Sequence, residues 1–276
     1  MANEPPYELI YWPIAPGRGE FIRLAFEETQ TPYIDIGKTL PTKDAFENAM
    51  SLVRGTDTGD ALNPPSFAVP ILRHGDNYIS QTSNILLYIA HRIPGLLGED
   101  KQHSEYRVNS LTLTALERLQ TEVHNVHHPI NTELYYEDQK DAAMLAAEMF
   151  LKKRLPLHLR YFERVLAGEA SGDGPWLSGG SLTYADLVLF HCLEGTQFQF
   201  PKAMAAAKES GKYKRVFELQ RAVRARPNIA AYFDSGRRQP FGMGVYRYYP
   251  ELDLAPEEEL EMDFQFDKLG IDIDKA

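Results

Sequence analysis

The sequence contains very little cysteine, because Cys192 is the single one among 276 residues. One thiol excludes a disulfide within the chain and a zinc site made of several cysteines. Long apolar runs are also missing, since none approaches the roughly 20 residues that a helix needs to span a bilayer. The first residues lack the basic and then apolar regions of a secretory signal. These absences predict a cytoplasmic globular protein without a membrane partner.

Positive charge is scarce as well, and the formal net charge is −10 at pH 7. Residues 251–276 contain ten acidic side chains and two lysines, so about −2 remains for the rest of the chain. A body that is nearly neutral argues against a nucleic-acid partner bound through a large basic field.

The acidic end, residues 241–276, is predicted to be a separate C-terminal extension. Its later apolar side chains alternate with polar ones, at Leu260, Met262, Phe264 and Phe266. Alternation favours an extended segment with one apolar face, packed on the body or on a partner subunit. A disordered acidic end is the alternative.

The first third of the chain alternates between strand and helix patterns. It predicts, in order, a strand, a helix, a strand, a weaker helix, a two-stranded hairpin and another helix, over residues 7–12, 19–29, 33–36, 43–53, 69–80 and 81–91. A strand-helix-strand start implies parallel pairing, and the hairpin adds an antiparallel edge. Residues 5–93 are therefore expected to form an α/β domain.

The strand signal disappears after Pro94-Gly95. Helical patterns follow over residues 104–126, 139–167, 183–194 and 213–226. The clearest helix start is at Thr183, whose side chain is placed to accept from the backbone N–H of Asp186 while Asp186 reaches back, as in a capping box. Residues 100–240 are therefore expected to form an all-helical domain.

One segment of the α/β half carries the features of a peptide-binding site. Gln81 and Thr82 open a helix, whose unpaired N–H groups and partial positive charge suit a carboxylate. Pro70 lies in the neighbouring strand run, where it marks an edge or a special turn, with a cis bond as one option. Together these features suit a small peptide held by its backbone and by one carboxylate.

Three motifs, in this order, carry a family resemblance over residues 7–240. They are YELIYWPIAPGRGEFIRL, then AVPIL followed by SQTSNILLYIA, then WLSGGSLTYADLVLF. The chain resembles a cytosolic glutathione transferase of the tyrosine type, similar to the sigma, mu and alpha classes. The resemblance implies a thioredoxin-like α/β domain followed by an all-α domain, with glutathione as co-substrate.

The same resemblance implies the catalytic residues. Tyr11 matches the tyrosine that activates the glutathione thiol, and a phenol that donates a hydrogen bond to sulfur lowers the pKa of a thiol. Arg18 matches an arginine that approaches this tyrosine and biases it electrostatically. Six residues separate Tyr11 from Arg18 here, where the family usually has five, so a surface arginine at a helix start is the alternative.

The binding residues also follow from the resemblance. Val69 and Pro70 match the residue before a cis-proline and the proline itself, and the Val69 main chain would pair with the cysteinyl backbone of glutathione. Gln81 and Thr82 match the pair that holds the γ-glutamyl group, with a threonine hydroxyl in place of the commoner serine.

The residues for the glycyl carboxylate do not match. Phe46 and Met50 fall where tyrosine-type members carry a tryptophan and a lysine. Lys43 and Arg54 are alternative cations, and the sequence does not choose between them.

His124, His127 and His128 form an unusual group. On a helix their spacing suits a metal ion, but a polar lining of the second-substrate cleft or of a dimer interface, and solvated histidines, are alternatives. No metal is expected for the reaction. The sequence thus favours a homodimeric glutathione transferase that acts on a hydrophobic electrophile. A glutathione-dependent isomerase or peroxidase and a non-catalytic ligand carrier, regulator or scaffold remain as rivals.

Overall fold

The computed structural model describes residues 4–56, 58–98 and 104–254. The alternating apolar residues expected in the acidic end, from Leu260 to Phe266, lie outside the described residues.

The first domain contains a four-stranded sheet in the order β2-β1-β3-β4. Its strands are β1 (Tyr7–Ile10), β2 (Tyr33–Asp35), β3 (Ile71–His74) and β4 (Asn77–Ser80). The strand β1 runs parallel to β2 and antiparallel to β3, and β3 and β4 pair antiparallel. The predicted parallel start and antiparallel hairpin edge are therefore confirmed.

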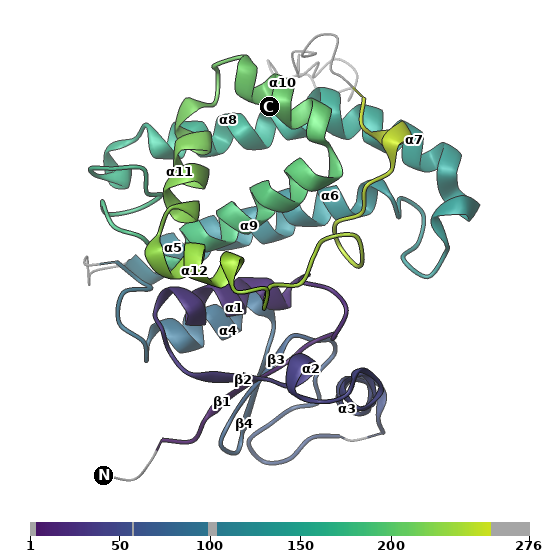
Figure 1. Ribbon diagram of the computed structural model, residues 1–276, viewed down its shortest axis with the longest axis vertical. Coiled ribbons are helices and arrows are strands. Elements are labelled where there is room, and N and C mark those ends of the chain that lie inside the picture. The colour runs from purple at the N-terminus through teal and green to yellow at the C-terminus, as the bar shows by residue number, and fades with distance from the viewer. Residues whose placement is uncertain (1–3, 57, 99–103, 255–276) are drawn as a thin grey trace, which may run out of the picture.

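Helices surround this sheet. They are α1 (Gly19–Glu28), α2 (Ile36–Thr39), α3 (Thr42–Arg54) and α4 (Thr82–Ala90). Figure 1 shows α1 and α4 between the sheet and the helical domain. Side chains alternate across β1, because Leu9 joins the main core with α1 and α4, whereas Ile10 packs with Ala49 of α3.

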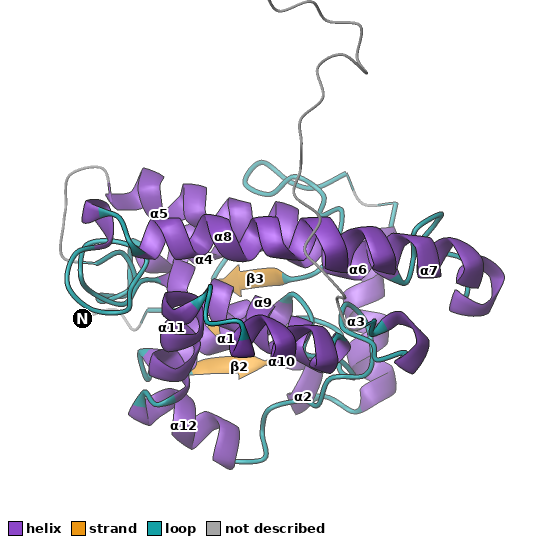
Figure 2. Ribbon diagram, turned by 90° about the horizontal axis from the view of Figure 1, so that it is seen from above, coloured by secondary structure: helices purple, strands orange, loops and turns teal. Residues whose placement is uncertain are grey.

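The rest of the described chain is helical. The longer elements are α5 (Ser104–Leu113), η1 (Thr114–Gln120), α6 (Thr121–Val126), α7 (Lys140–Met149), η3 (Phe150–Arg154), α8 (Leu155–Leu166), α9 (Tyr184–Gln199), α10 (Pro201–Glu209), α11 (Lys214–Arg224) and α12 (Pro227–Asp234). Short 3-10 turns are η2 (Tyr136–Gln139), η4 (Glu169–Ser171) and η5 (Pro250–Leu252). Seen from above, these helices cover the sheet (Figure 2). The thioredoxin-like domain followed by an all-α domain is thus confirmed.

The central helix α9 begins at the predicted capping box. The Thr183 side chain accepts from the Asp186 backbone, and the Asp186 carboxylate accepts from the Thr183 N–H at 2.7 Å. A second oxygen of Asp186 accepts from the Leu177 N–H at 2.8 Å. Cys192 is buried on α9, as expected for an apolar helix inside a core.

No helix within the described ranges is long and apolar enough to cross a membrane.

A buried charged network joins the two domains. Arg23 of α1 donates to Asp35 at 2.7 Å and lies 3.5 Å from Glu20. Glu20 also accepts from Arg238, at 2.9 Å, and from the Tyr232 hydroxyl, at 3.2 Å. Burying ions costs free energy unless they are paired, so this network fixes the last helix and the segment after it against α1.

Candidate functional site

The strand register brings the predicted site residues to one end of the sheet. Ile10 pairs with Ile71, and Ile71 pairs with Ser80. Tyr11 follows Ile10, Pro70 precedes Ile71, and Gln81 follows Ser80, so all three emerge at the same sheet end. Ligands of α/β domains commonly bind at such ends.

Tyr11 is held by the loop between β1 and α1. The backbone N–H of Arg18 donates to the Tyr11 hydroxyl oxygen at 2.8 Å. Gly17 has a positive φ of 39°, and a Cβ at this position would lie 2.2 Å from the Tyr11 hydroxyl oxygen. A Cβ at Gly19 would lie 2.6 Å from Tyr11 Cγ. Both glycines are therefore required by the close approach of the backbone to the tyrosine.

The loop is also tied to the helical domain. His191 of α9 donates to the Gly17 carbonyl at 3.3 Å, and its ring packs edge-on against Phe21 of α1. The N-terminus of α1 is thereby held against α9 at the point where it contacts Tyr11.

Burial raises the pKa of the Tyr11 hydroxyl, although the Arg18 N–H and the charge of Arg23 oppose this rise. The Arg23 guanidinium carbon lies 5.8 Å from the centre of the Tyr11 ring. Tyr11 therefore keeps its proton at neutral pH. Within the described ranges, no group accepts that proton in a hydrogen bond, so it is available to a ligand.

Arg18 contacts Tyr11 through its backbone N–H, whereas its side chain points to α6. One guanidinium nitrogen donates to Thr121 Oγ1 at 3.3 Å, on α6. The sequence did not indicate Arg23, which lies deeper and interacts with the tyrosine ring. Its helical position among buried apolar residues gave no signal of a functional role.

The remaining binding residues lie around the start of α4. The peptide bond between Val69 and Pro70 is cis. Gln81 is exposed, with a φ of 70°, and precedes the first residue of α4. Thr82 is only 2% exposed, and its hydroxyl oxygen has no hydrogen-bond partner among the described residues. A buried polar atom without a partner is rare in folded proteins and suits a ligand that completes it.

The two cations considered for the glycyl carboxylate lie at opposite ends of α3. Lys43 is exposed and lies 3.7 Å from Glu47, and Arg54 is the last residue of the helix. They are eleven positions apart on the helix, a separation of about 16 Å. Phe46 packs against Trp12, with ring centres 5.6 Å apart, and it supplies no charge.

A segment that the sequence did not place, residues 235–254, crosses the site, and we call it the strap. It leaves α12, passes the loop of Tyr11 and ends beside α7 (Figure 1). Gln239 donates to the Pro13 carbonyl. Tyr246 is 1% exposed, and a Cβ at Gly195 of α9 would lie 2.3 Å from its ring. The aromatic cluster VYRYYP was the available signal that this segment packs on the body.

Tyr11 is only 5% exposed. Burial raises the pKa of Tyr246, and its interaction with the Cys192 thiol raises it further. The charge of Arg18 lowers the pKa of Tyr246, and the Tyr11 hydroxyl raises it. Tyr246 therefore lies beside the candidate site.

The fold and this arrangement define a class: a thioredoxin-like domain with a tyrosine at the end of its first strand, joined to a helical domain. Comparisons with known proteins agree. The family described as "Glutathione S-transferase, C-terminal domain" matches residues 124–236. A glutathione S-transferase of Plasmodium falciparum is 26% identical over 200 residues, covering 71% of this chain and 83% of the relative.

Two further similarities extend this result. The mouse protein "Glutathione S-transferase Mu 2" is 27% identical over 204 residues, covering 73% of this chain and 81% of the relative. The structure of a Pi-class glutathione S-transferase of Onchocerca volvulus matches with a TM-score of 0.60 and 24% identity, covering 83% of this chain and 92% of the other. The chain is therefore distantly similar to glutathione S-transferases, a Mu-class member among them, and shares their fold.

Proposed function

We propose that the protein is a glutathione transferase in which Tyr11 ionises the thiol of glutathione. The observation that carries this proposal is the Tyr11 hydroxyl, which accepts from the Arg18 N–H and keeps a proton that has no acceptor among the described residues. That proton is donated in a hydrogen bond to the sulfur. A free thiol with a pKa near 8.5 is only a few per cent ionised at neutral pH, and the donated bond favours the anion.

The reaction then needs no metal. The thiol proton passes to solvent, and the thiolate sulfur forms a bond to the electrophilic carbon of a hydrophobic substrate. An activated thiolate is the common form of sulfur nucleophile in enzymes. The helical domain supplies the apolar surface for that substrate.

The start of α4 would hold the peptide. The Thr82 hydroxyl is buried without a partner among the described residues. We expect this hydroxyl and Gln81 to bind the γ-glutamyl group, and the first N–H groups of α4 favour the carboxylate of that group. Val69, before the cis-proline Pro70, would pair through its backbone with the cysteinyl residue.

Arg18 and Arg23 support the same step electrostatically. The charges of both lower the pKa of Tyr11 against the larger effect of burial. A phenol with a lower pKa is a stronger hydrogen-bond donor to an anion, so the two arginines make the tyrosine more effective.

We also propose a homodimer. Phe67 lies in the loop before Val69 and is 89% exposed, which is unusual for a large aromatic side chain and suits a contact with a second copy. Light scattering after size exclusion is expected to give twice the 31.4 kDa mass of the chain. A mass equal to one chain over micromolar concentrations would contradict the dimer.

The experiment for the proposed activity is an ultraviolet difference spectrum of bound glutathione near neutral pH. The native protein is expected to show thiolate absorption, and Tyr11→Phe to bind the peptide without it. Tyr7→Phe is the matched control, because Tyr7 lies on the same strand but stacks on His74 with ring centres 4.2 Å apart. Equal thiolate spectra in the native protein and Tyr11→Phe would rule out the role of Tyr11.

The same measurement separates the main rival. A protein that binds glutathione but shows no thiolate even with Tyr11 intact would be a ligand carrier or regulator with a transferase fold. Native thiolate absorption that Tyr11→Phe removes would exclude this rival.

A further inference from the structure

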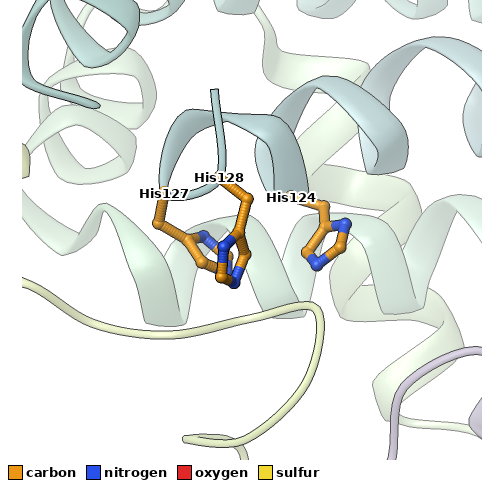
Figure 3. A group of neighbouring side chains, drawn as sticks. All are labelled: His124, His127 and His128. Atoms are coloured by element: carbon orange, nitrogen blue, oxygen red, sulfur yellow. The ribbon is translucent and has the colours of Figure 1, made fainter. Parts of the chain in front are cut away.

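Three histidines at the end of α6 form a compact group. His124, His127 and His128 each offer a ring nitrogen, and these nitrogens all lie within 4.8 Å of one another. The ring centres are 4.7 to 5.5 Å apart. Figure 3 shows the three rings projecting to the same side of one helix end.

Polar groups behind the rings fix two of them. Gln139 Nε2 lies 3.1 Å from His128 Nδ1, and Gln199 Nε2 lies 3.4 Å from His127 Nδ1. The Gln139 amide also donates to the carbonyl of Asn131, at 3.0 Å, and to that of Leu134, at 3.2 Å, and His128 donates to the Leu134 carbonyl. These contacts engage the Nδ1 atoms of His127 and His128, and His127 also interacts with the Gly244 backbone.

His127 is the most buried of the three histidines. It is completely buried, and its Nε2 atom has no hydrogen-bond partner among the described residues. Leaving a buried ring nitrogen unpaired costs about 1 to 3 kcal/mol. A core histidine with only a structural role would be expected to satisfy both nitrogens.

Neutral rings are the form that binds metal ions. Burial lowers the pKa of His124 to about 4 and that of His127 to about 2, and burial lowers the pKa of His128 as well. All three imidazoles are therefore uncharged near pH 7 and keep a lone pair on one nitrogen each.

We propose that His124, His127 and His128 form a binding site for one divalent transition-metal ion of the zinc type, with one coordination position left open. Three histidines and an open position are a known arrangement for zinc. Zinc–nitrogen bonds near 2.0 to 2.1 Å place tetrahedral ligands about 3.3 to 3.4 Å apart. His124 is partly exposed, so its side chain is free to rotate inward and close the difference.

The site is separate from the thiol chemistry proposed for Tyr11. Thr121, one helical turn before His124, accepts from the Arg18 side chain, so the two sites are neighbours along α6. A metal ion bound to the three histidines does not take part in the hydrogen bond that Tyr11 donates. Metal binding can therefore be tested without measuring transferase activity.

Two nearby arginines oppose the ion: Arg247 acts on all three histidines, and Arg18 acts on His124. The charge of Arg247 lowers the pKa of all three histidines, and its side chain donates to the Gly244 carbonyl at 3.1 Å. A positive charge at this place weakens the binding of any cation. Removal of the Arg247 charge should therefore tighten metal binding, whereas removal of a ligand should weaken it.

The test uses tag-free full-length protein stripped of metal with a chelator. Titration with Zn²⁺ is expected to give one ion per chain, and Co²⁺ the visible absorption bands of a tetrahedral complex. His124→Ala, at the partly exposed ligand, should weaken binding by at least about 100-fold, beyond the 10- to 100-fold typical of outer-shell changes. Arg247→Gln should tighten it several-fold.

His91→Ala is the matched control, because His91 lies at the surface beside Glu105 at 3.0 Å, and it should bind Zn²⁺ like the native protein. His127→Asn, checked for folding by circular dichroism, should lose the Co²⁺ bands. Native protein that binds Zn²⁺ no better than His124→Ala, or that gives only octahedral Co²⁺ absorption, would overturn the proposal.

Discussion

Two helices of this protein begin with a buried threonine, and they use it in opposite ways. At the start of α9, the carboxylate of Asp186 accepts hydrogen bonds from Leu177 and Thr183, so the helix end is satisfied internally. At the start of α4, the Thr82 hydroxyl has no partner among the described residues and no side chain caps the helix. The first start stabilises the fold, whereas the second has unused hydrogen-bonding capacity, which we propose serves a ligand.

The start of α1 is a third case. Its first N–H groups are directed at a side chain of the protein itself, because Arg18 donates to the Tyr11 hydroxyl. A helix end that would otherwise favour an anion is used here to orient a tyrosine. The comparison predicts that changes at α9 act on stability, changes at α4 on binding, and changes at α1 on chemistry.

The largest effect is expected at α9. Asp186→Ala removes a carboxylate that is completely buried and leaves the N–H groups of Leu177 and Thr183 without an acceptor. The free energy of unfolding should fall by about 3 kcal/mol. Urea denaturation followed by circular dichroism measures this, and a loss below the experimental error would show that the two helix starts are equivalent.

The next effect is expected at α1. Gly17→Ala would place a methyl group against the Tyr11 hydroxyl in a backbone conformation with φ of 39°, at a cost of about 1 to 2 kcal/mol. The tyrosine must move, so thiolate absorption of bound glutathione should disappear while the peptide still binds. Gly236→Ala, with a φ of 71° but open space around it, carries similar backbone strain and should retain the thiolate. A Gly17→Ala protein with normal thiolate absorption would contradict the geometry.

A smaller and more selective effect is expected at α4. Thr82→Val removes a hydroxyl that has no partner among the described residues, so stability should change by less than about 0.5 kcal/mol. The dissociation constant for glutathione should rise about tenfold, or about 1.4 kcal/mol. Calorimetry measures the binding and thermal unfolding the stability.

The matched change at α9 should show the reverse pattern. Thr183→Val removes a cap and should destabilise the protein by about 1 kcal/mol without altering glutathione affinity. If both threonine variants affect the same property, the division between a structural and a binding helix start is wrong.

The smallest effect concerns pH and contrasts Glu122 with Asp186. Burial raises the pKa of Asp186 to about 6. Burial also acts on Glu122, but its hydrogen bonds with His158 and Arg154 outweigh it and lower the pKa to about 2. The contribution of Glu122 to stability is therefore complete above about pH 4.5 and is lost as the pH falls towards 2.

Glu122→Gln should accordingly cost about 1 kcal/mol at neutral pH, since the pair is partly exposed and screened. The difference from the native protein should shrink as unfolding is measured from pH 5 down to pH 3. A difference that grows over this range would assign the opposite sign to the pKa shift.

Features that depend on neighbours in sequence were predictable. The capping box of α9 needs only Thr183 and Asp186, and the hairpin β3–β4 turns at Gly75, so a short stretch of sequence contains the whole signal. The parallel start and the antiparallel hairpin edge followed from chain direction and connection length. The sequence also placed Tyr11 at the C-terminal end of a strand over residues 7–12, whereas the strand itself ends at Ile10.

Features made by distant residues were not predictable. The contact of Glu20 with Arg238 joins positions 218 residues apart, and nothing local to either residue marks it. Of the strap, the sequence predicted only that residues from 241 onward belong to a separate C-terminal extension. The helices α10 and α12 were missed although each has a proline near its first turn, a recognised start signal.

The hydrogen bond between Glu20 and Arg238 also affects when the first domain can complete its contacts during synthesis. The first domain leaves the ribosome early, and the second basic partner of Glu20, Arg238, is made 218 residues later. Until Arg238 and Tyr232 emerge, this carboxylate depends on Arg23 alone, and the surface of α1 that α9 and α12 cover stays exposed. Domains generally fold as units during translation, but here the first domain reaches its final contacts only after the helical domain and Arg238 have been made.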